Sequence, residues 1–503
     1  MVKESIILHE NDNVAVALND ITTDNNKTIP LGHKFSLCSM KLGDIIYKYG
    51  MPIGKLLTGV DKGEHIHTHN LKTLLDQEGE LIYKYSKNDL VVDFNNKLNL
   101  SKEDYFYGYL RDNGKVGVRN EIWIIDTVGC IQGPSKKLQL EAYTRYYDQI
   151  KSGQIDGVYS FSHPYGCSRL GDNLKMTKDI LSGLINHPNA GGVLVLGLGC
   201  ENNNINELKK YLIEQNELTR PNSTIEWLNS QEVNDEIKTG LCKLDILVNE
   251  AIEAKRSKQP ISKLIVGLEC GGSDALSGIT ANTLLGNITN YLIERGGGAI
   301  LSEVPEMFGA EKDLMNRAKN KDVYNKIVNL ISDFKNYFRS NNQKIYKNPS
   351  PGNHEGGITT LEEKSLGNVK KSGNAIIKDV LDYGDSYNIS EGGLQLLSTP
   401  GNDLISSTAM AAAGAQLITF TTGRGTPLGS PVPVIKVSSN TNIYNLKPHW
   451  IDFDAGRLIN EDFSSIEREL LDLIRKISSG SKKTNNEKNG YREIDIWKDG
   501  IVL

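Results

Sequence analysis

Buried strands that alternate with helices are the feature of this sequence that most constrains its fold. After residue 104 the chain repeats continuous apolar, β-branched runs, separated by segments of helical length. Such runs are typical of strands buried on both faces, which requires a parallel sheet with helices on each side. The runs are EIWIIDT, GVYSFS, GGVLVLGLG, KLIVGLE, AILSE, LQLLST, QLITFTT and PVPVIKVS. The sequence therefore predicts an α/β region with Rossmann-like parallel sheets.

Helices and loops follow from the segments between these runs. We expect helices near residues 134–151, 173–186, 204–216, 232–257, 281–295, 309–339, 402–413 and 463–478. The segment KNPSPGNHEGGITTLEEKSLG is rich in glycine, which predicts a long loop of the kind that carries function. The tail SSGSKKTNNEKNG predicts a surface linker to a last strand-like segment, REIDIW.

The amino-terminal part has a different pattern, with short β segments divided by glycines where strands would reverse. This pattern predicts a compact, clip-like or barrel-like β domain, and the polar stretch YSKNDLVVDFNNKLNLSKEDY predicts a linker after it. At about 150 residues per domain, 503 residues correspond to about three domains. We therefore expect a β domain at 1–98 and two halves of the α/β region at 104–258 and 259–503.

Charge and composition exclude several classes of protein. The formal net charge is -5, with 57 basic and 62 acidic residues, which argues against a nucleic-acid-binding protein. No apolar run approaches the ~20 residues of a membrane helix, and the amino terminus lacks the apolar core of a signal peptide. Six cysteines are too few for a disulfide scaffold. We expect a cytoplasmic protein that does not bind a membrane.

Four of the cysteines directly follow predicted strands. They are Cys130, Cys167, Cys200 and Cys270. Because ligands of open α/β sheets bind outside the carboxyl ends of the strands, the four thiols are candidate ligands of one metal site. Thiolates favour iron, zinc or an iron–sulfur cluster over magnesium or calcium, and the alternative is that these cysteines are buried packing residues. Cys38 and Cys242 have no such context and are interpreted as packing residues.

Histidines are concentrated in the segment GEHIHTHN of the β domain. His65, His67 and His69 alternate, so they point to one face of an extended strand, and GHK adds His33 and Lys34. Three imidazoles on one face indicate metal binding, anion binding or proton transfer. The alternative is that they stabilise the small domain.

Three arginines are candidates for binding an anionic substrate. Arg119 and Arg169 lie in GKVGVRN and GCSRLGDN, and Arg424 lies between two glycines after a strand, where backbone amides and a guanidinium can bind a carboxylate together. Other polar residues at strand ends join this group, with helix capping as the alternative; they are Glu269, Ser273, Asp274, Glu303, Glu306, Asn402 and Asp403. Neither GxGxxG nor a P-loop occurs between a strand and a helix, which argues against a nucleotide cofactor.

Motifs spread over nearly the whole chain carry a family resemblance. They are GHKFSL, KYGMPIG, GEHIHTHN, GKVGVRNEIWIIDTVGC, FSHPYGCSRLGD, LGLGCENN, LECGGSDALSGITAN, SEVPEMFGAE, SPGNHEGGITTLEEKSLG, STPGND, TGRGTP and HWIDFDAG. With these motifs the chain resembles the altronate branch of the altronate/galactarate (hexarate) dehydratase family. The resemblance implies an amino-terminal SAF-type β-clip domain followed by an α/β dehydratase region.

The resemblance also implies an activity and a cofactor. It implies an iron-dependent hydro-lyase that converts D-altronate to 2-dehydro-3-deoxy-D-gluconate in hexuronate breakdown, with Mn²⁺ as a substitute for Fe²⁺. Removal of the C2 proton beside a carboxylate requires a Lewis acid, cationic donors and a base. The sequence assigns Arg119, Arg169 and Arg424 to the substrate carboxylate. It assigns His33, Lys34, His65 and His67 to catalysis, with the β domain closing over the strand ends.

Several alternatives stay open at this stage. At least three of the four strand-end cysteines are expected to bind iron, in a cluster or singly, and a mononuclear site built from the histidines is the rival. The activity could instead concern galactarate or a sulfolactate-type substrate, although the sulfolactate relative is usually divided into separate chains. A sugar-acid-binding protein without turnover is the hypothesis from a different class. A homo-oligomer, a dimer, is expected because partner subunits commonly complete such sites.

Overall fold

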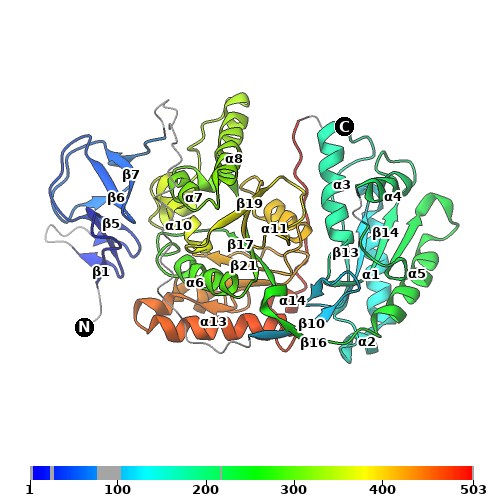
Figure 1. The fold of residues 1–503 in the computed structure, drawn as a ribbon. Coiled ribbons are helices and arrows are strands. Elements are labelled where there is room, and N and C mark those ends of the chain that lie inside the picture. Colours follow the sequence, from blue (N-terminus) through cyan, green and yellow to red (C-terminus); the bar gives the residue numbers. More distant parts are fainter. Residues whose placement is uncertain (1–3, 23–27, 76–103, 216–217, 501–503) are drawn as a thin grey trace.

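The computed structural model describes residues 4–22, 28–75, 104–215 and 218–500. They form three parts in a row, with the amino-terminal β domain at one end and the middle of the chain at the other (Figure 1). The carboxyl-terminal half lies between them and contains the largest sheet. The predicted linker around residues 88–104 falls almost entirely outside the described residues.

The β domain consists of short antiparallel strands. A four-stranded sheet has the order β1-β2-β5-β8, a three-stranded sheet has the order β6-β7-β9, and β3 pairs with β4. The strands are β1 Ser5–Ile6, β2 Val14–Ala17, β3 Ile21–Thr22, β4 Thr28–Ile29, β5 Lys34–Ser36, β6 Ile45–Lys48, β7 Met51–Leu56, β8 His65–Ile66 and β9 Leu71–Lys72. Pairing of β5 with β8 places Phe35 opposite His65, which brings the two histidine-bearing segments together.

A small antiparallel sheet connects the two α/β parts. Its strands are β10 Tyr105–Leu110, β11 Val116–Gly117 and β16 Ser257–Pro260. The strand β10 pairs with both of the others, so the chain enters and leaves the middle part side by side.

The middle part contains a four-stranded parallel sheet in the order β13-β12-β14-β15. Its strands are β12 Glu121–Asp126, β13 Gly157–Phe161, β14 Ala190–Gly197 and β15 Ile225–Asn229. Every residue of β12 and β14 is buried, as the continuous apolar runs predict. The helices are α1 Gln132–Arg145, α2 Tyr147–Lys151, α3 Gly171–Ile185, α4 Ile205–Glu214 and α5 Glu236–Ala251.

The carboxyl-terminal part contains a seven-stranded parallel sheet in the order β19-β20-β18-β17-β21-β22-β23. Its strands are β17 Ile265–Cys270, β18 Gly298–Leu301, β19 Ile377–Leu381, β20 Gly393–Leu397, β21 Leu417–Thr422, β22 Val434–Ser438 and β23 Phe453–Asp454. On one side of β17 the chain adds β18, β19 and β20, with β20 lying between β18 and β19, and it then returns to add β21 on the other side of β17. The order of strands therefore reverses between β17 and β21.

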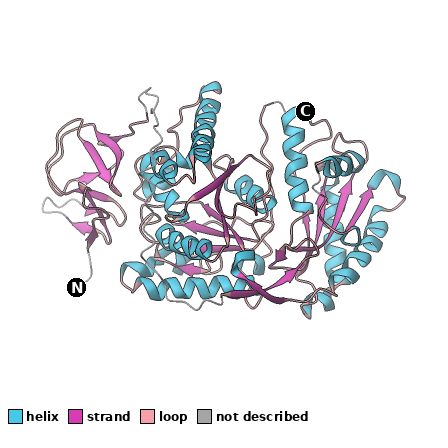
Figure 2. Cartoon of the chain, viewed as in Figure 1, coloured by secondary structure: helices cyan, strands magenta, loops and turns pink. Residues whose placement is uncertain are grey.

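Helices cover both faces of this sheet (Figure 2). They are α6 Ala281–Glu294, α7 Glu311–Asn316, α8 Lys321–Ser340, α9 Pro351–Glu355, α10 Leu361–Val369, α11 Asp403–Ala412, α12 Thr441–Leu446, α13 Phe463–Ser478 and α14 Asn485–Lys488. The helix α11 packs against α3, so it joins the two α/β parts. The prediction of an amino-terminal β domain followed by an α/β region with parallel sheets is confirmed.

Three local expectations are corrected by the structure. The helix expected at 309–339 is divided into α7 and α8, because Ala318 forms a bridge with Ile377 of β19. The expected long loop contains α9 and α10, because Thr360 caps α10 by accepting from the backbone N–H of Glu363. The segment REIDIW forms no strand and instead packs against the middle part, where Tyr165 donates to the carbonyl of Ile496.

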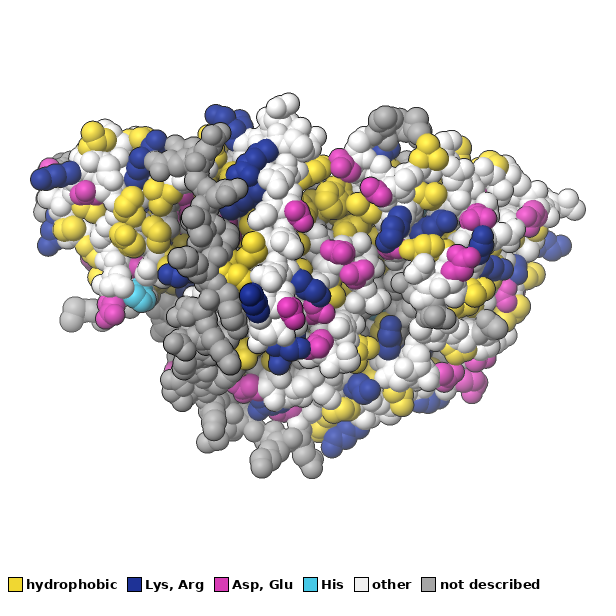
Figure 3. Space-filling model, turned by 45° about the horizontal axis from the view of Figure 1, so that its top comes forward, with side chains coloured by type: hydrophobic (Ala, Val, Ile, Leu, Met, Phe, Trp, Pro, Cys, Tyr) yellow, Lys and Arg dark blue, Asp and Glu magenta, His cyan; other side chains and the backbone are white. Residues whose placement is uncertain are grey.

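The distribution of surface charge and the lengths of the helices are consistent with the net charge and the hydrophobic content of the sequence. On the face shown in Figure 3, basic and acidic side chains are interspersed and form no field of a single sign. Among the helices of the described residues, none combines the length and the apolar composition needed to cross a bilayer.

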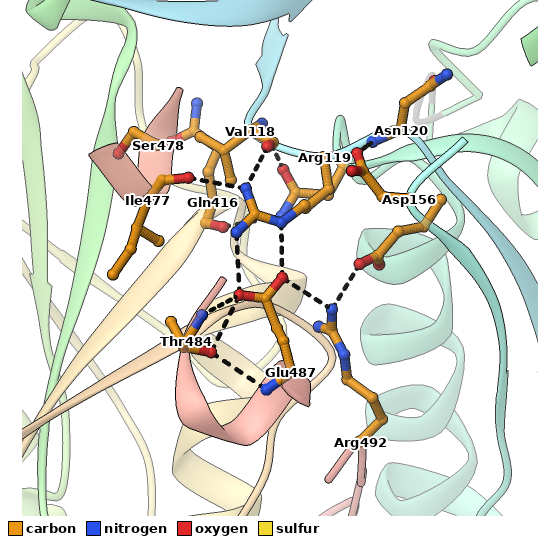
Figure 4. A network of polar contacts seen from close by, with 12 residues as sticks. Val118, Arg119, Asn120, Asp156, Gln416, Ile477, Ser478, Thr484, Glu487 and Arg492 are labelled. Carbon is orange, nitrogen blue, oxygen red and sulfur yellow. Dashed lines mark hydrogen bonds and ion pairs between the residues drawn. The ribbon is translucent and has the colours of Figure 1, made fainter. Parts of the chain in front are cut away.

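A buried network of charges ties the end of the chain to the middle part (Figure 4). Arg119 donates two hydrogen bonds to the carboxylate of Glu487, from Nε at 2.7 Å and from Nη2 at 3.0 Å. Arg492 lies 3.7 Å from the same carboxylate and 2.5 Å from Glu121. All four side chains are at most 4% exposed, so each charge depends on its partners for the solvation it has lost.

Replacement of Glu487 by glutamine leaves two arginines short of a buried counter-charge, so we expect a loss of about 3–5 kcal/mol of stability. Burial by itself raises the pKa of Glu487, but the charges of Arg119 and Arg492 outweigh it and lower the pKa to about 2. The stabilisation is therefore present above the ordinary pKa of 4.5 and is lost as the pH falls toward about 2. Chemical denaturation across this pH range measures both effects.

The matched control is Glu461→Gln, because Glu461 also pairs with an arginine, at 2.7 Å, but is 47% exposed. It should cost at most about 1 kcal/mol. Equal losses in the two variants would contradict the role given to burial.

Candidate active site

The reversal of strand order between β17 and β21 marks the place where a ligand of an open α/β sheet is expected. Cys270 ends β17, and Arg424 follows β21 by two residues. The backbone N–H groups of Gly423 and Arg424 both donate to the carbonyl of Gly272, which joins the two loops. The Cys270 motif and the Arg424 motif, which the sequence analysis identified separately, therefore meet at one edge of the sheet.

The β domain docks beside this edge through a buried triad of charges. Glu363 of α10 accepts from Lys48 at 2.7 Å and lies 2.9 Å from Lys34, and all three side chains are at most 2% exposed. The charges of both lysines lower the pKa of the Glu363 carboxyl, although burial opposes them. Burial lowers the pKa of Lys34 to about 8 against the attraction of Glu363. The triad fixes the β domain on α10.

Glycines permit the close approach of the two backbones. Gly357 has a φ of +94°, and a Cβ at this position would lie 2.7 Å from the carbonyl oxygen of Gly32. Gly32 itself has a φ of +83°. A side chain at residue 357 would therefore push away the loop that carries His33.

Three histidines of the β domain converge at this interface. One ring nitrogen from each of His33, His65 and His67 lies within 4.8 Å of the others. His33 Nδ1 is 3.0 Å from His65 Nε2, and the rings of His65 and His67 stack at 5.5 Å. His67 Nδ1 is buried and has no hydrogen-bond partner within the described parts of the chain. The predicted convergence is confirmed for His65 and His67, but β8 ends at Ile66 and His69 lies exposed in the turn that follows, outside the group.

These imidazoles are neutral near pH 7. Burial, followed by the neighbouring histidines, lowers the pKa of His65 to about 4. Burial and then the charge of Lys34 lower the pKa of His67 to about 3. Burial also lowers the pKa of His33. Neutral imidazole is the form that binds a metal or accepts a proton.

Glu355 connects the histidines to Arg424. His33 Nε2 lies 3.3 Å from the carbonyl oxygen of Glu355, and the carboxylate of Glu355 accepts from Arg424 at 2.8 Å. Arg424 is 47% exposed, so its guanidinium is accessible from solvent. The pair is worth little in stability at this exposure, which leaves Arg424 available to bind a carboxylate.

His354 is a residue of this site that the sequence analysis did not identify. Its ring lies 6.3 Å from that of His67, and its Nδ1 is 2.9 Å from the carbonyl oxygen of Ile358. Because a carbonyl can only accept, Nδ1 carries the proton and Nε2 carries the lone pair. The motif GNHEGG was part of the expected functional loop, and this was the signal available in the sequence.

The four strand-end cysteines do not meet at one edge. Cys130, Cys167 and Cys200 follow strands of the four-stranded sheet and are exposed, whereas Cys270 is buried in the seven-stranded sheet. The expectation of four thiols in one site is therefore corrected, because the strands that precede them belong to two sheets. Iron binding by the three exposed cysteines is left untested by this arrangement and is the alternative to the histidine site.

Arg119 and Arg169 belong to the middle part of the chain, whereas Lys34 lies in the docking interface next to the histidines. Arg119 is engaged by Glu487 and is 1% exposed, so the structure replaces its predicted substrate role with a structural one. Arg169 lies beside Cys167 in the middle part and stacks on Tyr165 at 3.8 Å. The Nζ of Lys34 is directed to Glu363 and to the carbonyl of Gly357, which makes it a positioning residue.

Comparisons with known proteins agree with this architecture. Residues 3–74 match the altronate/galactarate dehydratase SAF domain. Residues 108–252 match the second domain of D-galactarate dehydratase/altronate hydrolase, and residues 261–502 match the carboxyl-terminal domain of D-galactarate/altronate dehydratase. The fold and the site thus define a dehydratase with an SAF domain at its amino terminus.

Full-length relatives lead to the same family. The chain is 47% identical to the altronate dehydratase of Bacillus subtilis, with 100% of both chains covered. It is 42% identical to the altronate dehydratase of Escherichia coli, with 99% of both covered, and 29% identical to the galactarate dehydratase of that organism, with 99% and 97% covered. The chain belongs to the altronate/galactarate dehydratase family.

Replacement of Glu363 by glutamine should detach the β domain, because it leaves Lys34 and Lys48 buried without a counter-charge, at a cost of about 3–5 kcal/mol. We expect a lower melting temperature and faster proteolytic release of the β domain. Glu214→Gln is the control, since Glu214 is 59% exposed and 3.9 Å from Lys210. Identical melting and proteolysis of the two variants would show that the triad does not hold the domain.

Proposed function

We propose that this chain is a hydro-lyase that dehydrates D-altronate to 2-dehydro-3-deoxy-D-gluconate. The observation that carries the proposal is the convergence of three neutral imidazoles of the SAF domain beside Arg424, at the edge where β17 and β21 end. The two altronate dehydratases that match over their whole length support the choice of substrate.

The reaction removes a proton from C2 and hydroxide from C3, which together leave as water. The resulting enol then becomes the 2-keto acid by moving its hydroxyl proton to C3. Charge builds up on the carboxylate side of the substrate as the C2 proton leaves, so a cation must lie there. Hydroxide is a poor leaving group and needs an acid at C3.

Iron is the proposed cofactor, and His33, His65 and His67 fit it. The nitrogens converge, His67 Nδ1 meets no partner among the described residues, and His33 Nε2 donates to a backbone carbonyl. Such a donation from the second nitrogen commonly orients a metal-binding histidine. When bound, ferrous iron supplies a Lewis acid, and Mn²⁺ is a substitute for it. Three protein ligands leave coordination positions open, as catalytic sites require.

The remaining roles belong to residues around the histidines. Arg424 binds the substrate carboxylate in place of Glu355, since its exposed guanidinium presents two parallel N–H donors. His354 accepts the C2 proton, because its Nδ1 is held by the carbonyl of Ile358 and its Nε2 lone pair is free to receive one. The SAF domain brings the histidines to this edge and limits access of water.

The other candidate functions are distinguished by substrate and by turnover. A galactarate dehydratase would share the site, but the galactarate relative is less similar than the two altronate relatives. A sulfolactate-type lyase or a sugar-acid-binding protein without turnover remains a weaker hypothesis. A cytoplasmic location and a homodimer stay predictions.

An anaerobic assay with ferrous iron tests the function. D-altronate should give a 2-keto-3-deoxy acid, which a reagent that reacts with the keto group detects. Galactarate and sulfolactate should be turned over at least about tenfold more slowly. Faster turnover of galactarate would move the assignment to the sister activity. Binding of altronate without any keto acid, by folded and iron-loaded protein, would favour the binding protein.

Metal analysis tests the ligands of the iron. We expect His65→Asn to lose iron that the wild type retains after gel filtration, and a variant with serine at Cys130, Cys167 and Cys200 to keep it. His449→Asn is the control, because His449 lies outside the histidine group. Loss of iron and of inorganic sulfide from the serine variant alone would assign the iron to a cluster on the cysteines.

A further inference from the structure

A second group of metal-ligand residues lies inside the carboxyl-terminal part, separate from the histidines. One ligand atom from each of Cys270, Glu303 and Glu306 lies within 4.8 Å of the others, and the same holds for Glu269, Glu303 and Asp403. Glu303 belongs to both sets. The five residues therefore form one continuous group, which we call the Glu303 cluster.

Four members of the Glu303 cluster are buried, whereas Asp403 is only partly buried. Glu269 and Glu303 are 0% exposed, Cys270 is 2% exposed and Glu306 is 4% exposed. Helix capping was the alternative interpretation of these acids in the sequence analysis, but Glu303 makes no capping hydrogen bond to the 3-10 helix that follows it. Asn402, in contrast, does cap α11. Burial of these carboxylates therefore needs a different explanation.

The charges within the Glu303 cluster do not balance. Four carboxylates face two ammonium groups, Lys364 at 2.6 Å from Glu306 and Lys371 at 3.7 Å from Glu303. With all four carboxyls ionised and a neutral thiol the formal sum is two negative charges, which a dry interior does not tolerate unless protons or a cation compensate it. One divalent cation would compensate both charges, and one negative charge would remain if Cys270 binds it as a thiolate.

Unsatisfied atoms point into the Glu303 cluster. Glu303 Oε1 meets no hydrogen-bond donor, and Lys371 Nζ has no hydrogen-bond partner, in the described portion of the chain. Both side chains are fully buried. Glu303 also has a φ of +64°, a conformation that costs energy for a residue with a side chain and is found mainly at functional sites. The protein therefore strains its backbone to hold this carboxylate in place.

We propose that the Glu303 cluster binds one divalent transition-metal ion through Cys270, Glu303 and Glu306, with Glu269 and Asp403 beside it. A thiolate together with carboxylates suits Fe²⁺, Mn²⁺, Co²⁺ or Zn²⁺ and excludes Ca²⁺ and Mg²⁺ as preferred ions. Because its three ligands are buried, the ion has a structural role and does not bind substrate. It stabilises the edge where β17 and β18 end and so supports the loops that carry Arg424.

Cobalt is the probe for this site. The full-length protein is stripped of metal, titrated anaerobically with Co²⁺, and examined for near-ultraviolet thiolate-to-cobalt charge-transfer absorption. We expect this absorption in the wild type, in His65→Asn and in Cys242→Ser, and its loss in Cys270→Ser. Cys242 is an exposed cysteine on α5 and provides the matched control. Retention of the full absorption in Cys270→Ser would overturn the proposal.

Glu303→Gln provides a second test that does not depend on the thiol. We expect this variant to fold, because glutamine has the shape of glutamate and removes a poorly compensated charge. Co²⁺ should raise the melting temperature of His65→Asn, in which the histidine site is removed, but not that of the double variant His65→Asn/Glu303→Gln. An equal rise in the double variant, or no metal uptake beyond the histidine site, would show that protons alone balance the cluster.

Altronate turnover, measured in the same samples, separates this proposal from the proposed function. A wild type that is active but lacks the cobalt absorption refutes the metal site at the Glu303 cluster and leaves the dehydratase assignment intact. A wild type that shows the absorption but has no turnover supports the metal site and refutes the dehydratase assignment.

Discussion

Glu363 is the residue on which the arrangement of this molecule most depends. It lies between Lys34 and Lys48 of the SAF domain, in an environment that is almost free of solvent. Removing a buried carboxylate that pairs with one lysine already costs several kcal/mol of stability, and here two ammonium groups pair with the same carboxylate. Its second oxygen also accepts from the backbone N–H of Thr359, so the triad is oriented by the start of α10. The direction in which the histidines face follows from this geometry.

Apolar packing explains why the SAF domain cannot be regarded as an independent unit. Its strands are two to six residues long, and Ile46, Ile53 and Leu56 belong to the same hydrophobic cluster as Leu366 of α10. A domain of this size buries too little apolar surface to be very stable alone. Docking is therefore part of folding, and the histidine site forms together with the interface. Separation of the SAF domain from the rest would cost stability as well as activity.

The sequence predicted the features that depend on local pattern. Continuous apolar runs predicted the parallel strands, and the alternation correctly brought His65 and His67 together but not His69, because the strand ends at Ile66. The helix α10 was missed because the glycines around it suggested a loop, although Thr360 and Glu363 form the Thr-x-x-Glu spacing of a helix start. The weak strand β19 was missed because only its two end residues are buried. In both cases contacts with the surrounding fold determine the secondary structure, and the local sequence pattern does not show them.

For residues at strand ends, the sequence does not show which of them share one edge of a sheet. Cys200 and Cys270 each follow an apolar run and look equivalent, yet they belong to different sheets and differ in exposure. Which strands are neighbours is decided by the order in the sheet, and β21 joins β17 only after about 150 residues of intervening chain. Glu269, Glu303 and Asp403 come together by the same route, from β17, from the residues after β18 and from the start of α11. A candidate site at a sheet edge therefore needs the strand order first, because the residues that share an edge are adjacent in space and remote in sequence.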